Sequence, residues 1–474
     1  MSITVPAALN PIRLQRWGMI LLMAGLGLGL AITLALTNTG SLIYVTALPA
    51  LILGSLLIGV LFWNSTLNLV VAIAGFVVMA NNVEGFQLVE ILYAAYLYAL
   101  LGLWFVRYRL LDKQPIVTSR ADGALTVFLA LLPVTLVLTF TFNGDFRVAA
   151  SELISLSMLL IYYPVRHTVA THRTGPRIIL LTVVTLGALV AMVNLIEYAG
   201  DLSNAWAAVQ IAGSRVVVND CLLLTGALAS LTLLVYARKV WVASLYLGAF
   251  ALTFAGLIVT QTRGYWLAFI LGFAALLYLM NARQRARTLI GCAVAGGIIF
   301  GIAYVMIGPF LFVVAGGIIE RFGSLGTALT QDLSLINRFR ESWAVLRHIA
   351  WNPLIGYGPG VPYEFWDIVH QTTHIDTYVH NGYIGLWYKY GLWGLIAVMY
   401  FWLSTARRGI GAFRTQSADL WTRLAGISGA LPMIAVLVAT LTANPFYLKN
   451  YLFIIGVSAG MAAGAAARVD SARK

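Results

Sequence analysis

The stretch 178-IILLTVVTLGALVAMVNLIEYA-199 is predominantly apolar over 22 residues and contains a single charged side chain, that of Glu197. About 20 residues of this kind are enough for a helix to cross the hydrocarbon core of a bilayer. Similar runs recur along the 474-residue chain, which is 61% apolar and only 10% charged. A soluble protein has about 25% charged residues. The composition therefore excludes a soluble globular enzyme, a disordered chain and a peripheral protein with a single anchor.

The apolar runs predict an all-α polytopic membrane protein with about 12–14 transmembrane helices. Fourteen candidate spans lie near residues 17–37, 42–62, 66–80, 86–106, 123–142, 148–164, 178–199, 219–237, 241–260, 264–280, 289–307, 383–403, 424–443 and 451–467. The third run is short and the sixth contains Glu152, so twelve spans is the alternative count. Either even count places both termini on one side of the membrane.

The Lys and Arg residues indicate which side that is. Twenty-one of the 30 fall at the termini or in every second loop, where only four Asp or Glu accompany them. Cytoplasmic loops carry such an excess of cations, so we expect both termini in the cytoplasm. The formal net charge of +13 then reflects orientation in the membrane, and we do not expect nucleic acid as a partner.

One segment on the opposite side of the membrane is long and divides the chain into three parts. We expect a bundle of about 11 spans over residues 1–307. A partly helical loop domain should follow over residues 308–382. Further spans and a cytoplasmic tail should occupy residues 383–474.

Within this loop, 331-QDLSLINRFRESWAVLRHIAW-351 predicts an amphipathic helix, because apolar side chains recur every three or four residues. These side chains are those of Leu335, Phe339, Trp343 and Leu346. The next stretch, 352-NPLIGYGPG-360, should end the helix, since Pro and Gly interrupt helices. Its glycines at 356, 358 and 360 suit tight turns, or else a close approach of the backbone to a phosphate.

Nine cations remain on the side of the long loop, where cations are disfavoured. They are Arg147, Arg215, Arg263, Arg321, Arg338, Arg340, Arg347, Lys389 and Lys449. Most are Arg, whose guanidinium binds phosphate or carboxylate through two parallel hydrogen bonds. If Arg215, Arg263 and the three arginines in 338–347 converge, they form a cationic pocket for a lipid diphosphate. Otherwise, Arg263 extends to the membrane surface from a helix end and Arg347 lies on a solvated helix face.

Four of the six histidines also fall in the long loop, namely His348, His370, His374 and His380. A folded cap whose polar side chains meet water would explain them. Alternatively, His370, His374 and His380 could bind a metal, because the first two have the spacing of one helix face. A third interpretation is an acid–base histidine that takes a proton from an attacking hydroxyl beside bound phosphate.

The stretch 380-HNGYIGLWYKYGLWG-394 resembles the motif of O-antigen ligases, membrane enzymes that join a lipid-linked polysaccharide to the lipid A–core of lipopolysaccharide. That motif has a His and a small polar residue, nine further residues, and then Gly-x-x-Gly. The matching positions here are His380, Asn381, Gly391 and Gly394. Arg263, with Leu267 four residues on, is similar to a second feature of the family. The wider superfamily also contains O-antigen polymerases and bacterial O-oligosaccharyltransferases, which this motif separates poorly.

The resemblance implies a fold like that of type C membrane-embedded glycosyltransferases, acting without a metal or other cofactor and with inversion at the sugar. The donor would be undecaprenyl diphosphate-linked O-antigen, and the acceptor a sugar hydroxyl of lipid A–core. Membrane lipids would be further partners. The reaction would take place at the periplasmic face of the bacterial inner membrane.

The resemblance also implies roles for individual residues. His380 would be the general base, while Arg215 and Arg263 would bind the diphosphate and stabilise the departing charge. Further contacts with the diphosphate or glycan would come from Arg338, Arg340, Arg347, Asn381, Tyr383 and Asp220. Asn381 could orient His380, and Asp220 could position Arg215. A carboxylate that favours a helix N-terminus explains Asp220 equally well, and an interfacial aromatic explains Tyr383.

Ligation is the function that the resemblance favours. Polymerisation of the same lipid-linked repeat and glycosylation of a protein are the nearest alternatives. A transporter of polysaccharide or lipid is the alternative from a different class. Transporters place ionisable residues near the bilayer midplane, whereas most charges here lie at span ends or in the long loop.

Overall fold

The computed structural model describes residues 65–80, 88–204, 219–308 and 333–473, together with Val216 and a few single positions between 309 and 332. The chain divides into two compact units, residues 1–75 with 84–114 and residues 76–83 with 115–474. The described part of the first unit contains most of α3 (Ser65–Ala80), α4 (Leu88–Phe105) and a short π-helix (Val106–Leu111). Within it, the Tyr96 hydroxyl donates to the Asn68 carbonyl at 3.3 Å and joins α4 to α3.

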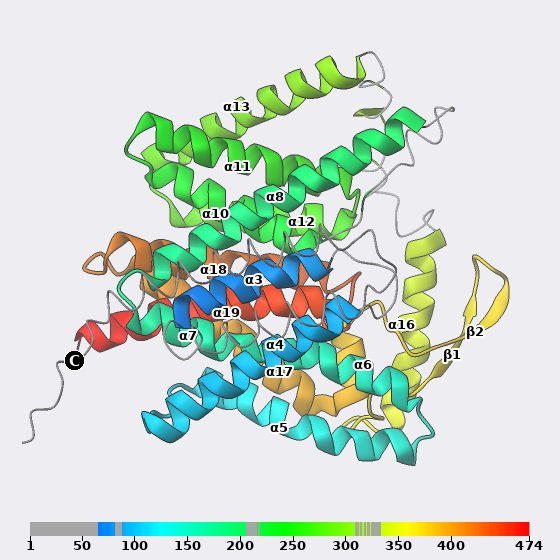
Figure 1. Ribbon diagram of the computed structural model, residues 1–474. Coiled ribbons are helices and arrows are strands. Elements are labelled where there is room, and N and C mark those ends of the chain that lie inside the picture. Colours follow the sequence, from blue (N-terminus) through cyan, green and yellow to red (C-terminus); the bar gives the residue numbers. More distant parts are fainter. Residues whose placement is uncertain are drawn as a thin grey trace, which may run out of the picture. The chain divides into compact units, whose positions relative to one another are not determined.

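The second unit contains most of the described helices (Figure 1). Its elements before the long loop are α5 (Arg120–Thr141), α6 (Phe146–Ser157), a 3-10 turn (Met158–Ile161), α7 (Tyr162–Thr171), α8 (Gly175–Asn204), α10 (Asp220–Tyr236), α11 (Val240–Val259), α12 (Arg263–Leu279) and α13 (Ala282–Ile307). Those that follow are α16 (Leu333–Trp351), β1 (Tyr363–Asp367), β2 (Thr372–Asp376), α17 (Gly382–Arg414), α18 (Leu420–Ala439) and α19 (Lys449–Arg473).

The chain is an all-α polytopic membrane protein, as its composition predicts. Seven helices in the described ranges are long and apolar enough to cross a membrane, and the shorter α10 and α12 are also apolar. Twelve of the fourteen expected spans coincide with helices. The one expected near 148–164 coincides with the continuous run Phe146–Thr171. The expected spans near 17–37 and 42–62 lie outside the described residues. The total of 12–14 spans and the division at 307 and 382 stay predictions.

The centre of the second unit is built on small residues. α19 is buried over most of its length and packs on α7 and α18. A Cβ on Gly460 would lie 2.7 Å from the Val165 side chain, and one on Gly464 would lie 2.6 Å from the Arg166 carbonyl. Helices in a bilayer associate through this kind of close backbone approach, because lipid chains are as apolar as leucine.

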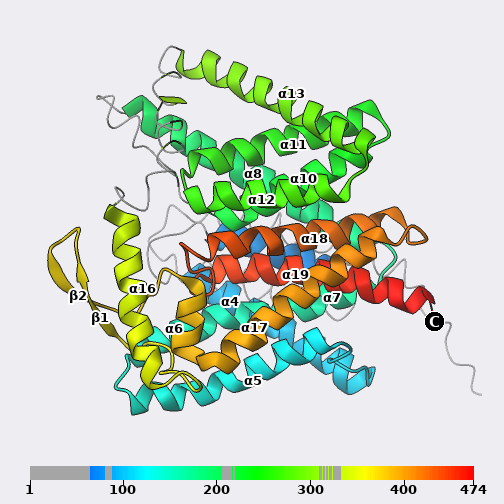
Figure 2. The same cartoon turned by 180° about the vertical axis from the view of Figure 1, so that it is seen from behind.

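The predicted amphipathic helix is present as α16, which runs across the ends of the other helices of its unit (Figures 1 and 2). Its predicted apolar stripe is wrong. The buried face consists of Glu341, Val345 and Ile349, whereas Phe339 and Trp343 are exposed. The aromatic residues misled the prediction because interfacial aromatics have the same helical spacing as a core stripe.

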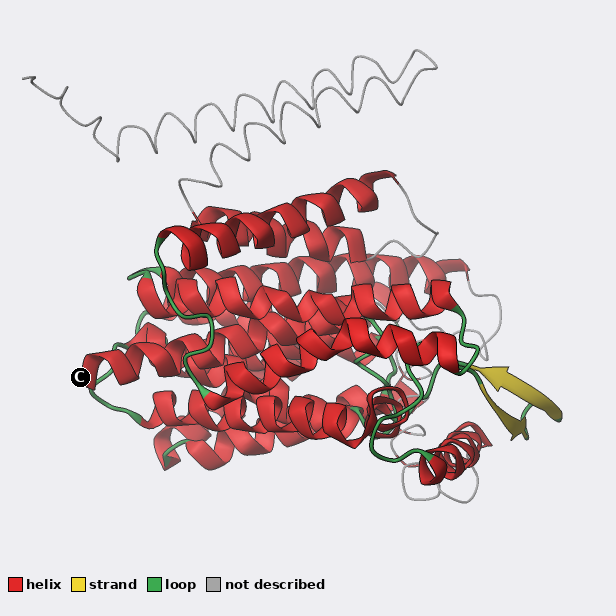
Figure 3. Cartoon of the chain, turned by 90° about the horizontal axis from the view of Figure 1, so that it is seen from below, coloured by secondary structure: helices red, strands yellow, loops and turns green. Residues whose placement is uncertain are grey.

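A β-hairpin follows α16 and extends beyond the helix ends (Figure 3). β1 pairs antiparallel with β2, and Phe365 lies opposite His374. Tyr363 and Phe365 point inward and pack with Val345 and Ile349 of α16. We did not predict these strands from the sequence, since each has only five residues.

The glycine-rich stretch 352–360 passes between helices, and α17 is broken where it passes. Gly391 has φ +67° and ψ 179°, and a Cβ there would lie 2.2 Å from the Leu354 carbonyl oxygen. The Leu392 amide donates to the Pro353 carbonyl at 3.0 Å. Only glycine adopts this backbone conformation readily. Gly391 therefore lets the chain approach α17 and redirects the helix.

The glycines of this stretch make equally close approaches. Gly356, Gly358 and Gly360 all have positive φ. A Cβ on Gly356 would lie 2.5 Å from the Gly391 amide nitrogen of α17, and one on Gly358 would lie 2.7 Å from the Thr139 amide nitrogen of α5. A Cβ on Gly360 would lie 2.3 Å from the carbonyl oxygen of Asp145, the residue before α6. The close contacts that these glycines permit are therefore with helix backbone.

A buried ion pair holds the same region. Lys389 Nζ lies 2.7 Å from Glu152 Oε2, and both side chains are less than 5% exposed. The Gly360 amide donates to Glu152 Oε1 at 3.2 Å. The carboxylate thus binds both α17 and the glycine-rich stretch, and the two deep charges neutralise one another.

We expect Gly391→Ala to lower the free energy of unfolding by about 2–4 kcal/mol, because a side chain there is both strained and in collision. Gly411→Ala is a matched control on α17, since a Cβ there meets nothing within 4 Å. It should be neutral or stabilise the protein by about 0.5–1 kcal/mol. Thermal unfolding in detergent measures both, and equal midpoints would contradict the account of the break.

Candidate active site

His380 is held by a carboxylate that reaches it from α16. His380 Nδ1 lies 2.5 Å from Glu341 Oε2, and its backbone amide donates to Glu341 Oε1 at 2.6 Å. The Glu341 side chain is 2% exposed, whereas that of His380 is 36% exposed. One buried carboxylate therefore fixes both the backbone and the ring of a partly accessible histidine.

This contact determines which ring nitrogen can act as a base. In a neutral imidazole one nitrogen carries the proton and the other accepts. When Nδ1–H donates to Glu341, Nε2 is the nitrogen with the free electron pair. A carboxylate behind the ring also stabilises the imidazolium that forms when Nε2 takes a proton. The pair is thus arranged for general base catalysis.

Aromatic rings line one side of His380. The Tyr378 and His380 rings meet edge to face with centroids 4.9 Å apart, and Tyr447 meets Tyr378 at 4.8 Å. Burial raises the pKa of the Tyr378 phenol, which the Asn444 amide and the charge of Arg338 lower in part. The Tyr378 hydroxyl accepts from that amide at 3.3 Å. The Tyr378 ring therefore covers one side of the imidazole, and Tyr447 supports Tyr378 from behind.

The connection between α18 and α19, residues 440–448, joins the parts of the site. Its Thr440 carbonyl accepts from the Gly382 amide at 2.9 Å, next to His380. Its Thr442 carbonyl accepts from Arg338 Nη1 at 2.7 Å. A Cβ on Gly264, the residue after Arg263, would lie 2.9 Å from Thr442 Oγ1. The 440–448 connection therefore contacts Arg338, the residue after Arg263, and the start of α17 close to His380.

The three arginines of α16 do not converge. Arg338 lies on the face of α16 that carries Glu341 and reaches Thr442. Arg340 and Arg347 are exposed on the other side of the helix. The two faces differ because 3.6 residues per turn separate positions 338 and 340 by more than half a turn. The expected cluster of all three arginines is wrong.

Other expected site residues have different local surroundings. Asn381 does not meet the His380 ring: its Oδ1 accepts from the Tyr383 and Ile384 amides and caps α17. The Tyr383 hydroxyl donates to the Leu437 carbonyl at 2.7 Å and packs α17 on α18. Asp220 is buried at the start of α10, beside Tyr451. Arg215 lies outside the described residues.

The histidines of the loop do not share one site. His370 Nδ1 lies 2.8 Å from Asp367 Oδ2, and His374 Nε2 lies 3.6 Å from Asp376 Oδ2. The hydrogen bond from His370 lowers the pKa of Asp367 to about 2. No group of three or more His, Cys, Asp or Glu side chains suited to a metal occurs in the part of the chain that the structure describes.

Sequence reasoning missed Glu341, the residue that orients His380. It is the only acidic residue of α16 and stands three residues after Arg338, so it shares a helix face with that arginine. An isolated carboxylate on a face that also carries buried aliphatic residues was the available signal. Its partner stands 39 residues away in sequence, which no local pattern reveals.

Comparison with known protein families finds a match that covers the region from α11 to α17. Residues 247–399 match the family described as O-antigen ligase. This region is similar to that family. The match includes Arg263, Arg338, Glu341 and His380, whereas the 440–448 connection lies beyond it. The search of curated proteins finds no match.

We expect Arg338→Ala to lower the free energy of unfolding by about 1–2 kcal/mol, since a charged hydrogen bond to a backbone carbonyl is lost. Arg340→Ala is the matched control on the exposed face and should change it by less than about 0.5 kcal/mol. Thermal unfolding in detergent compares the two variants. A larger effect at Arg340 would contradict the division of α16 into an inner and an outer face.

Proposed function

We propose that this protein joins O-antigen polysaccharide to lipid A–core, transferring the glycan from undecaprenyl diphosphate to a sugar hydroxyl. The match of residues 247–399 to the O-antigen ligase family supports a function of the ligase or polymerase type. The observation that carries the proposal is the His380–Glu341 pair, which supplies an oriented base within the matched region.

The reaction is a single displacement. The acceptor hydroxyl oxygen forms a bond to the anomeric carbon of the donor sugar while its proton passes to His380 Nε2. The bond from that carbon to the phosphate oxygen breaks, and the diphosphate leaves with the electron pair. One displacement inverts the anomeric carbon. Fixed cations beside the leaving group stabilise its charge without reorganisation at the moment of reaction.

In the proposal Arg263 and Arg338 supply this positive charge. Arg338 and Gly264, the neighbour of Arg263, both lie against the 440–448 connection, which the Gly382 amide also contacts two residues after His380. The Arg338 guanidinium has one donor on the Thr442 carbonyl and four others in its planar fork. Arg215 remains a proposed third cation on the basis of the sequence. Such a set needs no metal, so we propose a metal-independent transfer.

The charge distribution supports a periplasmic site in the inner membrane. His380 precedes the start of α17, and Arg407, Arg408 and Arg414 lie toward its other end. α19 ends at that same side, where the C-terminus lies opposite α16 and the hairpin (Figure 1). Cations at helix ends favour the cytoplasm. The C-terminus would then be cytoplasmic and His380 periplasmic, and we propose the same side for the N-terminus.

We expect His380→Ala to slow transfer by about 10³-fold or more, because the proton acceptor is lost. Glu341→Gln should slow it by about 10²–10³-fold, since a neutral amide does not stabilise the imidazolium. His374→Ala is the matched control, a half-exposed histidine on β2. Initial rates of glycan transfer at equal protein concentration measure all three. Full activity in His380→Ala would contradict the mechanism.

The acceptor is tested with purified protein in detergent and a defined lipid-diphosphate glycan, without added nucleotide. We expect glycan to appear on lipid A–core, with the same rate in the presence of a chelator. Lengthening of the donor glycan with no transfer to lipid A–core would instead indicate a polymerase. Transfer to neither, with a protein that unfolds at the normal temperature, would contradict both functions.

A further inference from the structure

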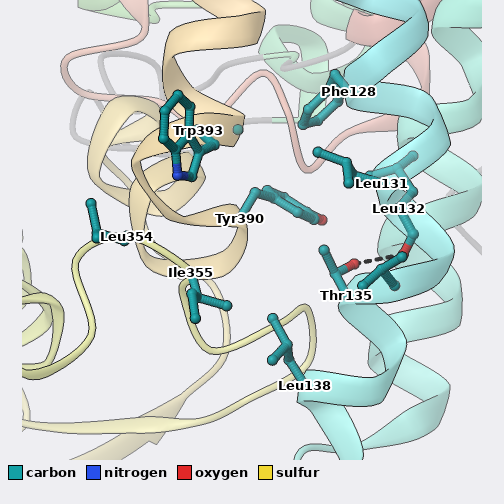
Figure 4. Close-up of a pocket in the computed structure, with 11 residues that line it drawn as sticks. Phe128, Leu131, Leu132, Thr135, Leu138, Leu354, Ile355, Tyr390 and Trp393 are labelled. Carbon is teal, nitrogen blue, oxygen red and sulfur yellow. Dashed lines mark hydrogen bonds between the residues drawn. The ribbon is translucent and has the colours of Figure 1, made fainter.

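An apolar groove lies between α5 and the part of α17 around the break at Gly391 (Figure 4). It has a volume of about 170 Å³ and does not include His380 or Arg338. Its walls include Phe128, Leu131, Leu138, Leu354, Ile355 and Trp393. The Thr135 hydroxyl in the wall donates to the Leu132 carbonyl at 2.7 Å, so it is already bonded within α5. The groove therefore suits a hydrocarbon chain.

The groove begins near the middle of α5 and runs toward the end of that helix nearer to α16 (Figure 1). Phe128 and Leu138 are ten residues apart, about 15 Å along a helix, and α5 ends at Thr141. This length is close to half of a hydrocarbon core about 30 Å thick. Leu354, Ile355 and Trp393 are each more than half exposed. Leu354 and Ile355 belong to the stretch 352–360 and Trp393 belongs to α17, so exposed apolar side chains from two elements border the groove.

The outer face of α16 has positive charge that no ion pair neutralises in the part of the chain that the structure describes. Arg340 and Arg347 are both exposed there, with the exposed Trp343 between them. The only acidic residue of α16, Glu341, is buried and bonded to His380. A face that combines guanidinium groups with aromatic rings is typical of a membrane–water interface. Its charge is complementary to phosphate, which arginine binds with two parallel hydrogen bonds.

The charged face and the groove are within reach of one lipid molecule. Arg347 stands one helical turn before Trp351, the last residue of α16, about 6 Å along the axis. Leu354, in the groove wall, follows Trp351 by three residues, a distance of at most about 11 Å. One leaflet of a bilayer with its head groups is about 20 Å thick. A phosphate at Arg347 can therefore belong to a lipid whose chain lies in the groove.

We propose that α16 and the groove together bind one phosphorylated lipid of the outer leaflet, with its phosphate at Arg347 and Arg340 and one chain along α5. This site is separate from the one around His380, since its arginines lie on the opposite face of α16 from Arg338. Selectivity among lipids comes from the phosphate, because their chains are alike, whereas the packing of one chain in the groove adds van der Waals contact. The groove fixes where that lipid sits.

The test uses the full chain in detergent and native mass spectrometry with dioleoyl-phosphatidylglycerol as probe. Val134→Trp places a large ring in the groove wall, and Val127→Trp is its control two turns earlier on the same face of α5, with similar exposure. Arg347→Gln removes a proposed phosphate contact, and Arg147→Gln is its control, an exposed cation that α6 carries in its first turn. Dioleoylglycerol and glycerol phosphate supply the chain and the phosphate separately.

We expect wild type and both controls to retain one phosphatidylglycerol. Val134→Trp and Arg347→Gln should each bind it about tenfold more weakly. Val134→Trp blocks the site of the chain, and Arg347→Gln removes one charged hydrogen bond to the phosphate. Neither dioleoylglycerol nor glycerol phosphate should bind alone with comparable affinity. His380→Ala should bind the lipid normally, so transfer and lipid binding fail independently.

Three results would overturn the proposal. One is equal binding by Val134→Trp and Val127→Trp, and another is equal binding by Arg347→Gln and Arg147→Gln. The third is binding of dioleoylglycerol as strong as that of phosphatidylglycerol, which would remove the role of the phosphate. The arginine variants are exposed and should fold normally, so they keep the test decisive if Val134→Trp is unstable.

Discussion

The close passage of residues 352–360 between α5, α6 and α17 is the constraint on which the surroundings of His380 depend. Backbone meets backbone here, and a Cβ at Gly391 would lie 2.2 Å from the Leu354 carbonyl oxygen. Because the glycine-rich stretch occupies this space, α17 is broken nine residues after it begins. His380, just before that first segment, is thereby presented to Glu341 of α16. Gly391 of the Gly-x-x-Gly pattern thus has a structural role, whereas the proposed transfer uses His380.

The candidate site depends on contacts between α16 and the 440–448 connection. α16 contributes an inner face with Arg338 and Glu341, and the 440–448 connection ties that face to the starts of α12 and α17. The buried carboxylate would be costly without a partner, and both of its oxygens are bonded to His380. The same contact therefore orients the proposed base, His380, and stabilises the packing of α16 against the start of α17. The proposed transfer uses the inner face of α16, and the proposed lipid site uses the outer face.

The sequence predicts the helices well because burial in a bilayer requires long apolar runs with every backbone group bonded internally. It also predicts that α16 ends before residues 352–360, since Pro and Gly there interrupt a helix. It failed where the decisive partner is distant. Phe339 and Trp343 suggested the wrong face for α16, because apolar character at an interface does not mean burial. Asn381 stands beside His380 in sequence, yet it caps α17, and the carboxylate that meets the ring is 39 residues away.

The Lys389–Glu152 pair bears on the alternative of a transporter. Ionisable groups that serve transport line a pathway and exchange partners. Here both charges are less than 5% exposed, and the carboxylate also accepts from the Gly360 amide. The ammonium lies 5.1 Å from the centre of the Tyr447 ring, which meets Tyr378 and through it His380. Loss of one partner would leave a buried charge at a cost of about 3–5 kcal/mol. The pair is therefore placed to hold the glycine-rich stretch and the aromatic wall in position, a structural task that favours a fixed catalytic site over a moving pathway.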